Sequence, residues 1–150
     1  MSLPTVHDPA RPILPGPVTR PRLPHFDHPR AVQHVVFRLA DSLPVTILGE
    51  LDRQKPSEKI NGAEAALDAG IGSRALAQPA VAGEMVKALG YFDGQRYGLA
   101  AWCVMPTHVH VLVEQMEGWP LADVVHGWKS FTARMINRAG DTRGRFWARN

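Results

Sequence analysis

Two histidines that are one residue apart are the side chains of this sequence best suited to chemistry. His108 and His110 lie in the run of residues 102–114, with Val109 between them. Because side chains alternate between the faces of a strand, both imidazoles should share one face, about 6–7 Å apart along the chain, while Val109 points to a core. Two imidazoles held in this way can bind a divalent cation. The alternative is an alternating strand with two solvated histidines.

The sequence around this pair resembles a known family. Residues 104–113, Val-Met-Pro-Thr-His-Val-His-Val-Leu-Val, are similar to the metal-binding core of the HUH tyrosine transposases, and most of all to that of the REP-associated tyrosine transposases, which have an IS200-like transposase domain. Thr107 stands where that family usually has Asn. The segments 96–99, 125–132 and 144–147 agree as well. The resemblance extends from about residue 33 to residue 150 and is strongest from residue 97 onward.

The resemblance implies DNA transposition by metal-dependent nicking and joining of single-stranded DNA. His108 and His110 would hold Mg²⁺ or Mn²⁺, and a third polar ligand would come from a C-terminal helix. The bound cation withdraws charge from the scissile phosphate. A tyrosine of the family then attacks phosphorus and forms a 5′-phosphotyrosine linkage. The implied partner is single-stranded or hairpin DNA, and a homodimer is left open.

The tyrosine nucleophile is the difficulty. In the family it follows closely after the segment that is here Phe146-Trp147, yet the sequence has no tyrosine beyond Tyr97. If the hairpin turns at residues 105–107, the partner of His110 is near residue 101 or 102, and Tyr97 is then about 13–16 Å away, too far for attack. Tyr91, at the end of a helix, is less suited still. The sequence therefore predicts a domain cut short before its tyrosine helix, with no catalytic residue to assign and no third metal ligand, inactive as written.

Two other functions remain open beside an inactive transposase-like protein. The chain could be a non-catalytic module that binds DNA hairpins. It could also be an unrelated small metal-binding protein that uses His108 and His110 without any DNA.

Length and composition favour one globular domain. A chain of 150 residues with 45% apolar and 21% charged residues can bury a core, and it contains no apolar run long enough to span a membrane. No signal segment opens the sequence, so we expect a cytoplasmic protein. Cys103 is the single cysteine and cannot form an internal disulfide; its place in an apolar run predicts a small core residue.

Basic residues accumulate towards the end of the sequence. Residues 126–150 contain six Lys and Arg against Asp141 alone, within a chain of net charge +3. Such a bias is typical of a surface that binds phosphates, although a solvated helix face is the alternative. The predicted DNA-binding residues are Lys129, Arg134, Arg138, Arg143 and Arg145.

The start of the chain divides into an arm and a domain. Residues 1–30 contain eight prolines, which remove backbone donors, so we expect an extended, disordered arm followed by one transposase-like domain over residues 31–150. A first strand is predicted over residues 33–39, with His34 in a structural role. Residues 45–51 fit either a helix or a second strand.

The remaining elements predict an α+β fold. Residues 57–69 suit one or two helical turns interrupted at Asn61-Gly62, and a helix should begin at Pro79 and stop at Gly90. A strand over residues 96–104 leads into the hairpin. The clearest helix follows residue 118, with an apolar stripe formed by Leu121, Val124, Val125, Trp128, Phe131 and Met135. These elements predict an antiparallel sheet with helices packed on it, and the resemblance implies that the fold is ferredoxin-like.

Overall fold

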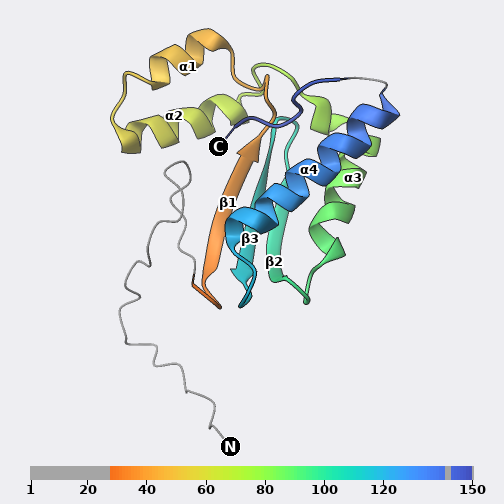
Figure 1. Cartoon of the computed structure of the whole chain (residues 1–150). Coiled ribbons are helices and arrows are strands. Elements are labelled where there is room, and N and C mark those ends of the chain that lie inside the picture. Colours follow the sequence, from red (N-terminus) through yellow and green to blue (C-terminus); the bar gives the residue numbers. More distant parts are fainter. Residues whose placement is uncertain (1–27, 141–142, 150) are drawn as a thin grey trace, which may run out of the picture.

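Strands and helices follow one another along the chain as the sequence pattern predicts. The computed structural model describes residues 28–140 and 143–149 (Figure 1). Its elements are β1 (Val32–Arg38), α1 (Val45–Leu51), α2 (Pro56–Asp68), a 3₁₀ turn (Ala75–Ala77), α3 (Pro79–Tyr91), β2 (Tyr97–Val104), β3 (His108–Gln115) and α4 (Leu121–Ala139). The predicted disordered arm lies outside the described residues, except for residues 28–30.

The three strands form an antiparallel sheet in the order β1-β3-β2, with β3 in the centre. His110 lies between Val36 of β1 and Cys103 of β2 in this register. The prediction of an α+β fold with an antiparallel sheet and packed helices is confirmed. The finer prediction of a ferredoxin-like arrangement stays a prediction.

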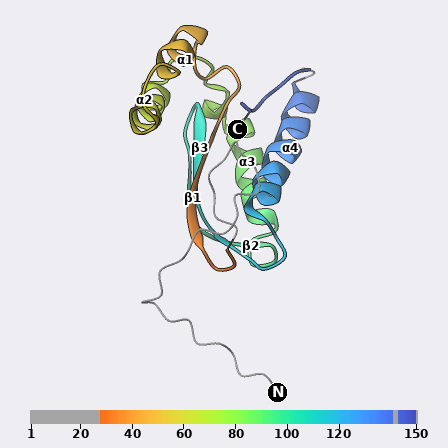
Figure 2. The same cartoon turned by 60° about the vertical axis from the view of Figure 1, so that its left-hand side comes forward.

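Helices α3 and α4 cover one face of the sheet (Figure 2). The alternating residues Val109, Val111 and Val113 of β3 point to this face and are fully buried. The hydroxyl of Tyr97 donates to the carbonyl of Leu89 at 2.7 Å and accepts from the indole of Trp128 at 2.9 Å. One buried phenol therefore links β2 to both helices, which fixes this side of the sheet.

The apolar stripe of α4 is narrower than its sequence predicts. Phe131 and Met135 remain 42% and 37% exposed, so the prediction that they belong to the packed stripe is wrong. Thr132 takes the inward place instead, because its hydroxyl donates to the carbonyl of Trp128 at 2.7 Å and is thereby satisfied inside the core. A helix that crosses a sheet on one face buries only the side chains on that face.

Helices α1 and α2 form a pair beside the end of the sheet where β1 stops (Figures 1 and 2). Residues 45–51 are helical, which decides between the two alternatives for them. Asn61-Gly62 does not interrupt α2, contrary to the prediction, because Gly62 lies where the helices touch. A Cβ atom at Gly62 would be 2.8 Å from Cδ2 of Leu51. The glycine thus permits close packing around a small core of Leu43, Leu51 and Leu67.

The end of the described chain returns to β1. Trp147 pairs with Leu39 in an antiparallel bridge, and its indole donates to the hydroxyl of Thr132 at 2.9 Å. The amide of Ala148 donates to the carbonyl of Arg38 at 2.9 Å. Trp147 and Ala148 therefore pack against the end of the first strand.

Candidate metal centre

His108 and His110 begin β3 and point away from the core formed with α3 and α4. Their Nε2 atoms are 2.9 Å apart, with ring centroids 4.7 Å apart and ring planes at 73°. The predicted geometry, two imidazoles on one face close enough to share an ion, is confirmed. Their role as metal ligands stays a prediction.

Thr107 fixes the orientation of the first histidine. Its hydroxyl donates to the carbonyl of Leu67 in α2 at 3.0 Å, and its oxygen is 2.7 Å from Nδ1 of His108. Because the one hydroxyl proton is already used, Nδ1 of His108 must be the donor. The lone pair of His108 is then on Nε2, which faces His110.

The ring of His34 is stacked on the ring of His110. Its Nε2 is 3.0 Å from Nδ1 of His110, and the two rings are stacked with centroids 5.2 Å apart and planes at 8°. When Nδ1–H of His110 donates to His34, the lone pair of His110 is directed at Nε2 of His108. Two lone pairs 2.9 Å apart repel each other, and a cation between them removes that repulsion. Such a second partner for a ligating imidazole is typical of metal sites in proteins.

A carboxylate completes the group. Oδ1 of Asp68, the last residue of α2, is 3.5 Å from Nε2 of His108. One ligand atom from each of Asp68, His108 and His110 lies within 4.8 Å of the others. The resemblance implies a third ligand from a C-terminal helix, which the sequence lacks, whereas this carboxylate comes from α2, 40 residues before His108. Two imidazole nitrogens and one carboxylate oxygen are a donor set that fits a divalent cation.

Burial favours the neutral form of His108. His108 is only 1% exposed, and burial lowers its pKa; His110 lowers it further, while Asp68 and Glu64 oppose the shift. A neutral imidazole is the form that binds metals. The side chain of Asp68 is 63% exposed, so the carboxylate of this group is in contact with solvent.

Cys103 does not behave as the sequence predicts. It pairs with His110 in the register and is exposed, so the prediction of a small core residue is wrong. Alternation places Cys103 on the histidine face, and α3 and α4 cover the other face. An apolar run in the sequence does not reveal which face of a strand a helix will cover.

The two tyrosines lie away from the histidines. The partner of His110 is Cys103 and not residue 101 or 102, because the hairpin turn places Val104 opposite Val109, and His110 is therefore opposite Cys103. Tyr97 pairs with Gln115, five positions from His110 and therefore about 17 Å along β3. It points into the core, where burial raises the pKa of its phenol. Tyr91, the last residue of α3, is 71% exposed. Neither phenol adjoins the candidate metal centre.

The five predicted DNA-binding residues differ in their exposure to solvent. Lys129 is half-buried, and its ammonium donates to the carbonyl of Ala148 at 2.7 Å. Burial, helped by Arg38, lowers the pKa of Lys129 to about 8. The other four are exposed, and are Arg134 and Arg138 on α4 and Arg143 and Arg145 after it. Lys129 therefore anchors the end of the described chain, whereas the arginines present charge to solvent.

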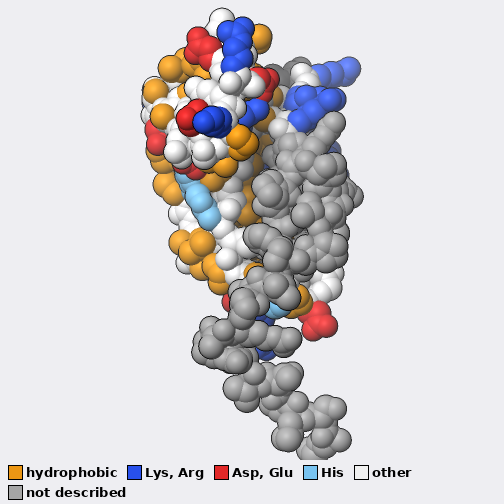
Figure 3. Space-filling model, turned by 90° about the vertical axis from the view of Figure 1, so that its left-hand side faces the viewer, with side chains coloured by type: hydrophobic (Ala, Val, Ile, Leu, Met, Phe, Trp, Pro, Cys, Tyr) orange, Lys and Arg blue, Asp and Glu red, His pale blue; other side chains and the backbone are white. Residues whose placement is uncertain are grey.

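The surface on the β1 side combines these features. Figure 3 shows histidine side chains on this face among apolar side chains, with both basic and acidic side chains towards its upper part. Exposed apolar and imidazole groups are suited to the flat rings of an unpaired nucleic acid, and basic side chains are suited to its phosphates.

Comparison with known proteins finds a family match in the second part of the chain. Residues 87–150 match the family model described as "Transposase IS200 like", so the resemblance predicted from the sequence is confirmed there. This range contains both histidines, but α1 and α2, with Asp68, lie before it. Searches of curated proteins and of solved structures gave no match. In the described residues, no helix has the length and apolar content that crossing a bilayer requires.

Proposed function

We propose that this chain acts in DNA transposition by binding single-stranded DNA at a metal ion held by His108 and His110. The proposal starts from the match of residues 87–150 to the IS200-like transposase family. The observation that carries the proposal is the pair of Nε2 atoms 2.9 Å apart at the start of β3, inside the matched range. Thr107 and His34 engage the other ring nitrogens, so both imidazoles are oriented before any ion arrives.

Asp68 supplies the third ligand in this proposal, and Mn²⁺ or Mg²⁺ is the ion. Imidazole ligands suit Mn²⁺ better than Mg²⁺, which prefers oxygen ligands and water. When bound, the cation withdraws charge from a phosphate oxygen of the DNA. The residues themselves orient the ligands and leave the exposed side of the centre open to the phosphate.

Cleavage and joining require a hydroxyl in line with the phosphate. The hydroxyl of Tyr97 is hydrogen-bonded to Leu89 and Trp128 in the core, and Tyr91 is an exposed residue at the end of α3. We therefore expect the 150 residues to bind DNA without forming a covalent adduct, so that a hydroxyl from elsewhere would have to complete the reaction. This position of the tyrosines also favours the second candidate function, a non-catalytic module that binds DNA hairpins.

The proposed DNA contacts are phosphate contacts. The exposed arginines Arg134, Arg138, Arg143 and Arg145 would neutralise phosphates, and the affinity should fall steeply with salt as counterions are released. Lys129 would act indirectly, by holding the end of the described chain in place. A cytoplasmic location and a homodimer belong to the same proposal.

The test measures metal and DNA binding together. A labelled hairpin oligonucleotide with single-stranded flanks is titrated with protein in Mn²⁺ or in EDTA, and the fluorescence anisotropy is followed. The paired change His108→Gln with His110→Gln should abolish the part of the affinity that depends on Mn²⁺, whereas His126→Gln, an exposed histidine on α4, should not. Unchanged Mn²⁺ dependence in the double variant would refute the proposed centre. Mn²⁺ binding without any DNA binding would favour the unrelated metal-binding protein.

A denaturing gel of the same mixtures tests for a covalent adduct. We expect none from the 150 residues. An adduct at Tyr91 or Tyr97 would show that the positions of these tyrosines do not prevent attack, and the chain would then be a transposase in its own right.

A further inference from the structure

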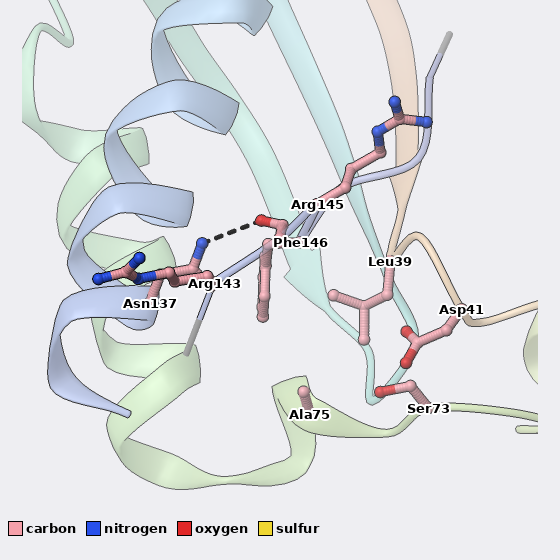
Figure 4. Close-up of a pocket in the computed structure, with 9 residues that line it drawn as sticks. Leu39, Asp41, Ser73, Ala75, Asn137, Arg143, Arg145 and Phe146 are labelled. Carbon is pink, nitrogen blue, oxygen red and sulfur yellow. Dashed lines mark hydrogen bonds between the residues drawn. The ribbon is translucent and has the colours of Figure 1, made fainter. Parts of the chain in front are cut away.

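A separate cavity of about 250 Å³ opens beyond the end of β1 (Figure 4). Four segments that are distant in the sequence form its walls: the end of β1 and the following turn, the loop before α3, the last turns of α4 and the segment after α4. The lining residues are Leu39, Asp41, Ser73, Ala75, Asn137, Arg143, Gly144, Arg145 and Phe146.

Backbone contacts fix these walls relative to one another. The amide of Ser73 donates to the carbonyl of Asp41 at 3.0 Å, and the side-chain amide of Asn137 donates to the carbonyl of Gly144 at 3.0 Å. Gly72 has φ +104°, and a Cβ atom there would be 2.6 Å from the carbonyl oxygen of Asp41. Only glycine permits this close approach. These contacts hold the Asp41 turn to the loop before α3, and the segment after α4 to α4 itself.

The lining divides into three chemical parts. Leu39, Ala75 and the ring of Phe146 form an apolar wall, and in Figure 4 the ring points into the cavity. The carboxylate of Asp41 and the hydroxyl of Ser73 lie on the opposite side. The guanidinium groups of the two arginines extend outwards from the rim. A flat apolar surface, an acceptor facing it and cations outside form the complement of a nucleotide.

We infer that this cavity receives one unpaired nucleobase that carries an amino group. The base would stack on Phe146, as bases of single strands stack on aromatic side chains. Its exocyclic amine would donate to Asp41, and the phosphates on either side of it would meet Arg143 and Arg145. Adenine and cytosine present an amino group on their hydrogen-bonding edge, whereas thymine presents a carbonyl oxygen there, which a carboxylate repels.

The cavity lies at the same end of the sheet as the candidate metal centre. The amide of Leu39, a wall residue, donates to the carbonyl of Thr107 at 3.0 Å, and Thr107 orients His108. The inference rests on the proposed function in taking single-stranded DNA as the ligand. It assigns a different role, however, because base selection by Asp41 requires neither a metal nor a tyrosine.

Mononucleotides test the cavity without the metal centre. The ¹⁵N-labelled chain in EDTA is titrated with dAMP, dCMP and dTMP, with deoxycytidine and with inorganic phosphate, and the backbone amide resonances of Ser73, Ala75 and Gly144 are followed. We expect dAMP, dCMP and deoxycytidine to shift these resonances, and dTMP to bind about fivefold or more weakly, the lower end of what one specific base contact contributes. Equal shifts for all three nucleotides, or shifts with phosphate that match those with dCMP, would overturn the inference.

Three variants separate the roles of the lining residues. Asp41→Asn should remove the preference for dAMP and dCMP over dTMP. Phe146→Leu should weaken the binding of every nucleotide, while the amide spectrum remains that of a folded protein. Asp123→Asn, an exposed acid at the start of α4, is the matched control and should change nothing. A preference that survives Asp41→Asn would contradict the inference. Since the nucleotide titrations contain no metal, their results are independent of the anisotropy test. If DNA binding depends on Mn²⁺ but the cavity shows no base preference, the proposed function is retained and only the inference about the cavity is refuted.

Discussion

The two faces of the sheet are stabilised in different ways, although β3 contributes alternate residues to both. On the side of α3 and α4, Val109, Val111 and Val113 are fully buried among apolar side chains. On the other side, the rings of His108 and His110 are each oriented by a hydrogen bond to Thr107 and to His34, respectively. Apolar packing spreads its stabilisation over many contacts, whereas the histidine geometry depends on two partners. The first face should therefore determine stability, and the second should determine metal affinity.

Loss of an aromatic side chain from the packed face should have the largest effect. Phe37 of β1 is 2% exposed and its ring packs against Trp128 and Trp147. We expect Phe37→Ala to lower the free energy of unfolding by about 3–5 kcal/mol, through lost burial and the cavity left behind. Urea denaturation measures this loss. Val32→Ala, at a 55% exposed position of the same strand, is the control, and a similar loss there would erase the contrast between the faces.

Removal of the Thr107 hydroxyl should affect both stability and metal affinity. Thr107→Val keeps the shape but leaves the carbonyl of Leu67 and Nδ1 of His108 without their partner, so we expect a loss of about 1–3 kcal/mol in the free energy of unfolding. Mn²⁺ affinity, measured by calorimetry, should fall as well. Thr107→Ser retains the hydroxyl and should restore both; if it does not, the methyl group rather than the hydrogen bonds is what matters.

Removal of His34 should affect metal affinity alone. His34 is exposed, and its ring contacts that of His110, so His34→Ala should lower Mn²⁺ affinity by about 10–100-fold, the usual cost of losing the partner of a ligating imidazole. The free energy of unfolding without metal should change by no more than about 0.5 kcal/mol, as for other surface changes. His126→Gln is the matched control in the same calorimetric titration. An unchanged Mn²⁺ affinity in His34→Ala would mean that the metal does not bind to His110.

The smallest expected effect is a pH dependence at Lys129, which belongs to neither face. Its pKa is about 8 in the folded protein against 10.5 ordinarily, because burial disfavours the charged form. Between these two values the unfolded chain binds the extra proton, so the free energy of unfolding should rise with pH relative to Lys129→Met. Water screens a partly exposed ammonium, and we expect a difference of about 1 kcal/mol or less. Urea denaturation of both proteins from pH 7.5 to 10 measures it; a difference that falls with pH would refute the shift.

Features that depend on neighbouring residues in the sequence were predictable. The shared face of His108 and His110 follows from their spacing, and α3 begins at Pro79 as its sequence indicates. Features that depend on distant contacts were not. Asp68 reaches the histidines only because α2 packs at the end of the sheet, and the exposure of Cys103 depends on which face the helices cover. Nothing near either residue in the sequence signals these contacts.

Two consecutive residues of α2 contact the histidine site. The carbonyl of Leu67 accepts from Thr107, and the carboxylate of Asp68 is beside His108. The helix pair α1–α2 has only a small leucine core of its own, so it should open locally at a lower free energy than the sheet. A cation bound between Asp68 and the histidines would close that opening by mass action. Amide hydrogen exchange in α2, far more than in α3 or α4, should therefore slow as Mn²⁺ is added, which makes the mobility of one helix pair a reporter of the occupancy of the centre.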